Sequence, residues 1–344
     1  MPGPSGFIRQ GSSANRTVSS VIGGGYALTK TGLGILVLSS ASNSYTGPTT
    51  ILGGILSVVS LGNVGVNSYL GSSSAAASNL LIDGGTLRFS NPSGSVSTNR
   101  AITIGAGGAT LEKNGASGTQ KIAASPVFSA SATLTLAGSS TSLASFGSLS
   151  NVIADGAGGA VASVTKSGTG WWGLSSFSAN TYTGPTLISG GVLIISSTAQ
   201  PSNSSGITAD GGEVCFAGTM SRPVAIQNTA GSSICASTNG TSTANGTISS
   251  TLTFGGSNSK IRFCTNGTTT VSTITQSTAS QTVALNGVTV DCTAGQNLNA
   301  GTYTILTIAG TSTFTGTATA GLKPANCTTM TTQIVGQSLQ IVVT

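Results

Sequence analysis

Apolar residues in this chain fall in short, mostly alternating runs, with polar residues between them. Clear examples are residues 34–39, 85–90, 133–136, 191–195 and 338–344. Gly, Asn, Ser or Pro bounds almost every run. Period-two patterning with this punctuation is typical of short β-strands separated by tight turns. The pattern therefore predicts a chain made almost entirely of strands.

Helices are not expected. A helix needs apolar residues at positions i, i+3, i+4 and i+7 without interrupting glycines. The window 298–308 looks apolar, but it contains Gly301 and several β-branched residues. Within a strand, successive side chains face opposite sides, so Leu36 and Leu38 share one face and Ile35 and Val37 share the other. We expect an all-β protein with essentially no helix.

One stretch of the chain occurs twice. Leu28-Thr-Lys-Thr-Gly-Leu-Gly is followed by Tyr45-Thr-Gly-Pro-Thr and Gly53-Gly54, and the same order returns from Val164 through Tyr182 to Gly190-Gly191. The lysines are 136 residues apart (166 − 30) and the tyrosines 137 apart (182 − 45), so the copies differ by one inserted residue. An insertion at that place indicates a loop. The chain therefore contains a genuine internal repeat.

The repeat distinguishes between all-β architectures. Many short strands fit a sandwich, a barrel or a β-helix, but a tandem module is expected of a solenoid, which stacks successive turns. At roughly 22 residues per coil, near the lower limit of solenoid repeats, the chain makes about 15 coils. We predict a parallel β-helix.

The repeat also predicts the organisation of the chain. Asp83-Gly-Gly, Phe89, Arg100 and Ile102 are followed in the same order by Asp210-Gly-Gly, Phe216, Arg222 and Ile226, so each module has about 130 residues. We expect a polar N-terminal arm (1–20), a first module (21–155), a second module (156–284) and C-terminal coils (285–344). The last run, 338–344, has no polar cap after it, so we expect an uncapped strand that pairs with another molecule.

The repeated motif resembles a known family. Residues 28–56 and 164–193 carry Leu/Val-Thr-Lys-Thr/Ser-Gly-x-Gly, then Tyr-Thr-Gly-x-Thr, then Gly-Gly-x-Leu. This pattern is similar to the passenger-associated, or autotransporter-associated, β-strand repeat of large bacterial surface proteins. Residues 83–89 and 100–108 look like the sequence that separates such repeats. The resemblance implies a right-handed parallel β-helix displayed outside a bacterial cell, without catalytic residues.

Composition excludes several classes of protein. Only 5% of residues are charged and 50 are glycine, which is unlike an average cytosolic enzyme. With 38% hydrophobic residues, the chain is also unlike a disordered protein. No apolar run is long enough for a membrane-spanning helix, so we expect no membrane span. The net charge is +6, but the basic residues are scattered, so we expect no nucleic-acid partner.

Candidate catalytic residues are few. Histidine, the commonest general base and metal ligand, is absent. The six acids are Asp83, Glu112, Asp155, Asp210, Glu213 and Asp291. Two of them stand in Asp-Gly-Gly, where we expect the carboxylate to accept local hydrogen bonds in a turn. The acids lack the short regular spacing of repeat calcium sites. We predict no catalytic residue, no metal site and no cofactor.

The five cysteines all lie in the second half of the chain. They are Cys215, Cys235, Cys264, Cys292 and Cys327, with gaps of 20, 29, 28 and 35 residues (235 − 215, 264 − 235, 292 − 264, 327 − 292). Each gap resembles one coil, so neighbouring cysteines would face each other on adjacent turns. We predict a disulfide between Cys215 and Cys235. The alternative is that buried free cysteines pack as small apolar residues.

Trp171-Trp172 replaces Ile35-Leu36 of the first copy. Adjacent strand residues face opposite sides, so one tryptophan should point inward, and we expect Trp171 to point outward. An outward Trp171 could stack on a sugar or pack against another subunit. Packing under a loop or against a neighbour is the favoured interpretation, because a lone aromatic forms a poor saccharide pocket.

We expect a non-enzymatic extracellular or cell-surface protein, secreted by a bacterium. Our first hypothesis is a structural subunit of a surface layer or filament, in which copies associate end to end, because a non-closing contact between subunits gives a fibre. The alternative is an adhesin or glycan-binding passenger with cell-surface polysaccharide as partner. A further alternative is a phage or virion appendage, suggested only by a start without a recognisable secretory leader.

Overall fold

The structure is a computed structural model that describes residues 8–9, 14–90, 94–115, 118–141 and 145–344. Its strands are short and parallel over most of the chain, and the two helices in the described part are single 3₁₀ turns, Ala77–Asn79 and Ala157–Gly159. Neither is long or apolar enough to cross a membrane. The chain divides into two compact units, 1–184 and 185–344. The boundary falls inside the second repeat, and the module boundaries expected from sequence stay predictions.

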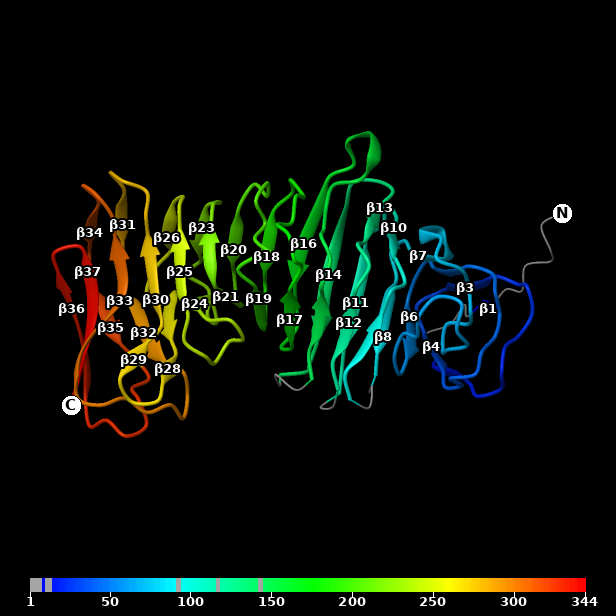
Figure 1. The fold of residues 1–344 in the computed structure, drawn as a ribbon, viewed down its shortest axis with the longest axis horizontal. Helices are drawn as coiled ribbons and strands as arrows, with labels where there is room; N and C mark the ends of the chain where they lie inside the picture. Colours follow the sequence, from blue (N-terminus) through cyan, green and yellow to red (C-terminus); the bar gives the residue numbers. More distant parts are fainter. Residues whose placement is uncertain (1–7, 10–13, 91–93, 116–117, 142–144) are drawn as a thin grey trace. The chain divides into compact units, whose positions relative to one another are not determined.

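In the first unit, successive turns of the chain add one strand to each of three parallel sheets (Figure 1, blue to green). The first sheet contains β1 (Ile8–Arg9), β3 (Leu28–Thr31), β5 (Thr49–Ile51), β7 (Leu80–Ile82), β10 (Thr103–Ile104) and β13 (Val127–Phe128). The second contains β2 (Arg16–Val18), β4 (Ile35–Leu38), β6 (Ile55–Val58), β8 (Thr86–Phe89), β11 (Ala109–Lys113), β14 (Ala132–Gly138) and β16 (Ala162–Lys166). The third contains β9 (Val96–Thr98), β12 (Gln120–Ile122), β15 (Gly147–Leu149) and β17 (Trp171–Leu174).

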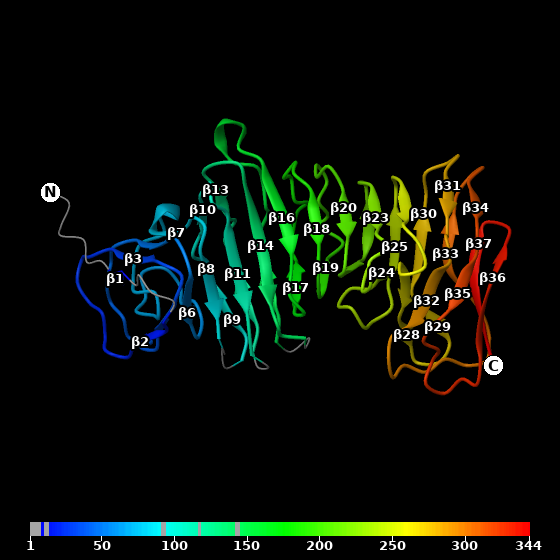
Figure 2. The same cartoon turned by 180° about the vertical axis from the view of Figure 1, so that it is seen from behind.

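The second unit is built in the same way (Figure 2). One parallel sheet contains β18 (Thr186–Ile188), β20 (Ile207–Ala209), β23 (Val224–Ile226) and β26 (Leu252–Phe254). The next contains β19 (Val192–Ile195), β21 (Glu213–Phe216), β24 (Ser233–Ala236), β27 (Lys260–Phe263), β32 (Val288–Cys292) and β35 (Ala318–Ala320). A third contains β22 (Gly218–Met220), β25 (Asn245–Ile248), β30 (Thr273–Gln276), β33 (Gly301–Ile308), β37 (Ser338–Val343) and β36 (Met330–Val335). Two small sheets pair β31 (Thr282–Ala284) with β34 (Thr313–Thr315), and β28 (Thr265–Asn266) with β29 (Thr270–Val271).

The core of the first unit is a set of columns of identical or similar side chains. Backbone pairing in register stacks five leucines of β4, β6, β8, β11 and β14 directly above one another. These are Leu36, Leu56, Leu87, Leu111 and Leu136, and each is at most 1% exposed. Burying one such side chain contributes roughly 1.5–3 kcal/mol. The predicted parallel β-helix, with alternate residues of each strand facing inward, is confirmed.

The lysine of the repeated motif lies inside the coil. The side chain of Lys30 is completely buried, and its Nζ donates to the carbonyl oxygens of Thr31 (2.8 Å), Gly32 (2.7 Å) and Gly53 (3.1 Å). The equivalent Lys166 is also buried and donates to Ser167 O (2.6 Å) and Gly168 O (3.2 Å). The ammonium group thus donates to carbonyls of its own turn and, in Lys30, to one of the next coil, so the buried charge is hydrogen-bonded. Burial lowers the pKa of Lys30, and it lowers that of Lys166 to about 8.

The glycines of the motif allow the turns to approach each other. Gly32 and Gly54 have positive φ angles of 71° and 61°, which side chains other than glycine rarely adopt. A Cβ atom on Gly54 would also lie 2.6 Å from Gly34 O. The Thr-Lys-Thr/Ser-Gly and Gly-Gly segments therefore repeat for a steric reason.

Two expectations about the ends of the chain need correction. The final run is not an uncapped strand, because β37 pairs antiparallel with β33 on one side and β36 on the other. Residues 330–343 form a hairpin, and with β33 on the other side both edges of β37 are paired. In β36 the apolar residues Met330, Ile334 and Val335 do not alternate regularly with polar ones, so the hydrophobic pattern alone does not predict this strand. In the expected polar arm, residues 1–7 and 10–13 lie outside the described residues. Arg16–Val18 nevertheless forms β2 and pairs with β4, because backbone hydrogen bonds need no apolar side chain.

Replacing Lys166 with Met tests the buried charge. Burial holds the pKa of folded Lys166 near 8, whereas an ordinary lysine has a pKa of 10.5. The unfolded chain therefore binds more protons between these values, and stability rises with pH. Relative to Lys166→Met, the wild-type free energy of unfolding should rise by a few kcal/mol from pH 8 to pH 10.5, at about 1.4 kcal/mol per pKa unit. Urea unfolding at both pH values measures this. The exposed Lys121→Met is the control. Identical pH dependence in wild type and Lys166→Met would contradict the lowered pKa.

Candidate functional site: a cysteine and arginine cluster in the second unit

The densest group of chemically active side chains lies on the outward face of one sheet of the second unit. On β21, Val214 and Phe216 point into the core, so Glu213 and Cys215 face the other way. Backbone pairing places Cys215 opposite Cys235 of β24, and Cys235 opposite Arg262 of β27. Three residues distant in sequence therefore form one row across adjacent coils.

Arg262 is the centre of this cluster. Its guanidinium binds Glu213 with two hydrogen bonds, Nε to Oε1 at 2.5 Å and Nη2 to Oε2 at 2.8 Å. Nη2 also lies 3.2 Å from Cys215 Sγ and 3.3 Å from Cys235 Sγ, and Nη1 donates to Gly240 O at 2.8 Å. Burial lowers the pKa of Arg262, but the carboxylate of Glu213 more than compensates and raises it overall. The arginine is therefore permanently charged, and its guanidinium is hydrogen-bonded to Glu213, to both sulfurs and to Gly240 O.

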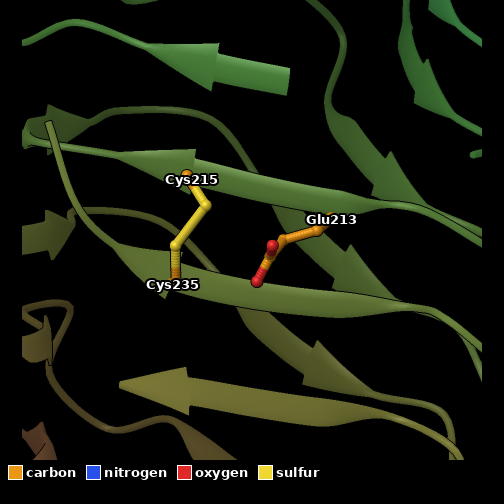
Figure 3. Close-up of side chains that lie close together, drawn as sticks. All are labelled: Glu213, Cys215 and Cys235. Carbon is orange, nitrogen blue, oxygen red and sulfur yellow. A yellow bond between two sulfur atoms is a disulfide. The ribbon is translucent and has the colours of Figure 1, made fainter. Parts of the chain in front are cut away.

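The structure joins Cys215 and Cys235 by a disulfide, the pair that the sequence analysis selected (Figure 3). Their Cα atoms are 4.7 Å apart, within the range that a disulfide spans. Cys264, Cys292 and Cys327 are free and buried. Burial raises the pKa of Cys292 to about 12, so this thiol is unreactive at neutral pH.

The cluster could in principle hold a metal ion, because the carboxylate of Glu213 and the two sulfurs lie within 4.8 Å of one another (Figure 3). However, Arg262 already donates hydrogen bonds to all three groups. A positive side chain in that position competes with any cation. The local chemistry therefore favours a structural ion pair over a metal site.

Long loops cover the cluster. Gln296 donates from Nε2 to Thr241 O (2.6 Å) and accepts at Oε1 from the backbone N–H of Thr265 (2.6 Å). Asn299 N donates to Thr268 O (2.7 Å), and Ala325 N donates to Gln296 O (2.7 Å). These bonds connect residues 237–244, 264–272, 293–300 and 322–329, which belong to successive coils. Two of these segments contact Arg262 itself, because its Nη1 donates to Gly240 O and Thr293 Oγ1.

All six acids make specific structural contacts. Glu112 pairs with Arg88 (2.9 Å), Asp291 with Lys260 (2.7 Å), and Glu213 with Arg262. Asp155 accepts hydrogen bonds from Ala162 N (2.8 Å) and from Thr183 N and Oγ1 (3.1 and 2.7 Å). Slight burial raises the pKa of Asp155, but these hydrogen bonds lower it overall. Each carboxylate therefore has a role in holding coils together.

Both Asp-Gly-Gly segments lie where the chain bends, but their carboxylates do not accept the local hydrogen bonds that we expected. Asp83 Oδ1 accepts from Gly107 N at 2.6 Å, and Asp210 Oδ1 accepts from Thr229 Oγ1 at 2.5 Å. Both partners lie on the following coil, 24 and 19 residues further along, so neither bond is local to the turn. These aspartates link successive coils, which a single sequence could not show because the coil length sets the partner.

Trp172 is fully buried and donates from Nε1 to Ala137 O at 2.7 Å, whereas Trp171 is half-buried on the opposite face. Because Gly147 pairs with Trp172, the half-buried Phe146 lies beside Trp171. Gly173 leaves room for this ring, since a Cβ there would lie 3.1 Å from Phe146 Cε2. The role of Trp171 as a contact residue stays a prediction.

Sequence reasoning missed the pairing of Arg262 with Glu213. A signal existed, because Lys260 and Arg262 alternate on one strand and acids are rare in this chain. It could not identify the partner, because two coils of unequal length separate Glu213 from Arg262.

Comparison with known proteins identifies the repeated motif. Residues 28–58 and 164–195 both match the family model of the passenger-associated-transport-repeat. The chain is also 37% identical over 171 residues to the adhesin BmaC autotransporter of Brucella suis biovar 1 (strain 1330). That match covers 48% of this chain and 5% of the adhesin. The resemblance expected from sequence is confirmed for the two repeats.

Counting reactive thiols tests the Cys215–Cys235 bond. Denatured, unreduced protein should take up three alkyl groups from iodoacetamide, because three cysteines are free, and reduced protein should take up five. Intact mass measures both numbers. Cys215→Ser should leave four alkylated thiols without reductant, as Cys235 loses its partner. Five alkylated thiols in the unreduced wild type would rule the disulfide out.

Proposed function

We propose that this chain is a non-enzymatic β-helical passenger of a bacterial surface protein, displayed outside the cell, where it mediates adhesion. The support is the pair of passenger-associated-transport-repeats together with the similarity to an autotransporter adhesin. Because the chain spans only 5% of that relative, its binding partners cannot be transferred and are left to experiment.

Every carboxylate of the chain takes part in a contact between coils. This observation supports the non-enzymatic part of the proposal. Hydrolases and lyases that use acid–base catalysis need titratable groups free to reach a substrate. Here the acids are bound to arginine, lysine, threonine hydroxyls or backbone N–H groups. The fold then offers extended surfaces instead of a reactive site.

Surface display tests adhesion. A non-adherent bacterium that displays the full chain should attach to host cells or to a polysaccharide-coated surface several-fold better than one that displays an unrelated β-helix. Trp171→Ala should reduce attachment, because the partly exposed ring of Trp171 supplies binding area on the outward face. Tyr26→Ala, which removes another exposed aromatic, is the control. Attachment equal to that of the unrelated β-helix would refute the proposal.

End-to-end association remains a second proposal, although the predicted uncapped β37 no longer supports it. Its support is the open edge of two other strands, since β34 and β35 are the last strands of their sheets. Unpaired strand edges favour pairing with another chain. The hairpin covers part of this end, where Thr332 Oγ1 donates to Ala318 O at 2.7 Å.

Light scattering across a concentration series tests association. The wild type should form larger species as concentration rises, and Ala320→Lys on the exposed edge of β35 should suppress them, because a lysine on an edge strand opposes pairing. Lys121→Met, at an exposed position of the interior strand β12, should behave as wild type. A wild type that stays monomeric at every concentration would remove this candidate.

A further inference from the structure

One sheet of the second unit carries a regular array of hydroxyl groups on its outward face. We call this the hydroxyl face; it belongs to β22, β25, β30, β33, β37 and β36. Inward positions of these strands are buried, as for Met220, Ile248 and Ile308. Side chains alternate along a strand, so the residues between them point outward. Strands β25, β30, β33 and β37 lie side by side in both views (Figures 1 and 2).

Backbone register aligns the outward residues in a straight column. Thr219 pairs with Thr247, Thr247 with Thr275, Thr275 with Thr307, and Thr307 with Ser338. Five consecutive strands therefore present a hydroxyl at the same position. All five residues are exposed or half-exposed.

A second column runs beside the first, two residues further along each strand. It contains Ser221, Ser249 and Ser277, and all three are exposed. The backbone keeps this column in register, because Ser249 N donates to Met220 O (2.9 Å) and Ser277 N donates to Ile248 O (2.9 Å). The motif Thr-x-Ser thus recurs on three successive strands.

Strand geometry fixes the spacing of the array in two directions. Adjacent strands lie about 4.8 Å apart, and residues i and i+2 on one strand lie about 6.6 Å apart. β-Branched threonine has few rotamers, so its hydroxyl and methyl groups are held in place. The face is therefore a preorganised lattice of small polar groups with two short repeat distances.

The hydroxyl face is also free of charge. None of its six strands contains Asp, Glu, Lys or Arg. The neighbouring sheet differs, because β21, β27 and β32 carry Glu213, Lys260, Arg262 and Asp291. A charged side chain would retain its own hydration shell. The ligand that fits this face is accordingly uncharged.

The hydroxyls of the first column are available for a ligand. Within the described part of the chain, the side-chain hydroxyls of Thr219, Thr247, Thr275 and Thr307 make no hydrogen bond to protein. By contrast, the neighbouring Thr273 Oγ1 is bound to Asn245 Oδ1 at 2.8 Å. The column can therefore donate and accept hydrogen bonds outward without breaking internal ones.

We propose that the hydroxyl face binds the surface of ice. Ice presents flat, uncharged planes of water in which oxygen atoms recur at short fixed spacings, one of them close to the distance between β-strands. Water that bridges polar groups costs entropy when it is immobilised, but water in ice is already ordered. A rigid array likewise loses little freedom on binding.

Two other occupants suit the face less well. Neutral polysaccharides are usually held by aromatic stacking, yet the only aromatic residue of the six strands is Tyr303, whose hydroxyl donates to Asn299 O at 3.0 Å. A second copy of the chain would need a more apolar patch, because the centres of stable interfaces are enriched in aromatic residues and methionine. The columns of Thr and Ser contain neither aromatic residues nor methionine.

The inference rests on the proposed function only in that the face must be displayed outside the cell. It specifies one surface to which such a passenger would adhere. The ice experiment uses purified chain and no cells. If displaying cells attach to other surfaces but the purified chain does not adsorb to ice, the ice inference is overturned and the proposed adhesion is not.

Partition into growing ice is the test, using fluorescently labelled full chain. The wild type should concentrate in the ice fraction and inhibit ice recrystallisation. Thr275→Lys places a charge and bulk in the middle of the column, and we expect at least about tenfold weaker adsorption, equivalent to about 1.4 kcal/mol. Thr253→Lys is the matched control, because it adds the same charge at an exposed position of β26 on another sheet. Circular dichroism checks that both variants fold.

Retention of ice adsorption in Thr253→Lys and its loss in Thr275→Lys would support the proposal. Exclusion of the wild type from ice would overturn it. Equal loss in both variants would also overturn it, because the effect would then come from charge alone. Binding to an insoluble neutral polysaccharide that Thr275→Lys abolishes, without ice adsorption, would assign the face to a glycan instead.

Discussion

The in-register pairing of parallel strands is the constraint on which the rest of this protein depends. Each coil places its strand residues about 4.8 Å from their equivalents on the next coil. The neighbours of a side chain are therefore the residues at the same position on the coils before and after it. Inward columns of leucine form the core, as in Leu36, Leu56 and Leu87. Outward columns bring cysteine opposite cysteine and threonine opposite threonine. The groups of interacting side chains described above are therefore brought together by the stacking of coils.

The few charges follow from the same constraint. Lysines of the repeat lie inside the coil, where carbonyl oxygens of glycine-containing turns solvate them, and the acids join one coil to the next. A charge buried in this way is stable only with several hydrogen bonds. That requirement explains why the Thr-Lys-Thr/Ser-Gly sequence is kept as a unit in both copies. One sheet of the second unit has no charged residue in its strands. Its outward columns carry hydroxyl groups, and exposed Ile334 and Val335 lie on its edge strand β36.

Period-two patterning and the repeat were enough to predict the all-β parallel solenoid, because strand alternation and coil stacking are local or tandem properties. They also led us to predict a disulfide between Cys215 and Cys235, and the structure places these two residues opposite each other on adjacent strands. They were not enough for β36, because its apolar residues Met330, Ile334 and Val335 do not alternate regularly with polar ones. This strand forms by backbone pairing with β37. The uncapped end was therefore a wrong expectation about a strand that folds back on itself.

The sequence by itself determined the class of fold, the repeat, the inward or outward direction of most strand residues and the scarcity of catalytic groups. Each of these depends on neighbours within a few residues or on direct repetition. Only the tertiary structure decided which coil each residue meets: Arg262 with Glu213, Asp83 with Gly107, Thr247 with Thr275. The physical reason is that the coils differ in length, because their loops differ in length. The register between distant residues is therefore set by backbone hydrogen bonds in the folded solenoid, and the spacing of residues in the sequence does not predict it.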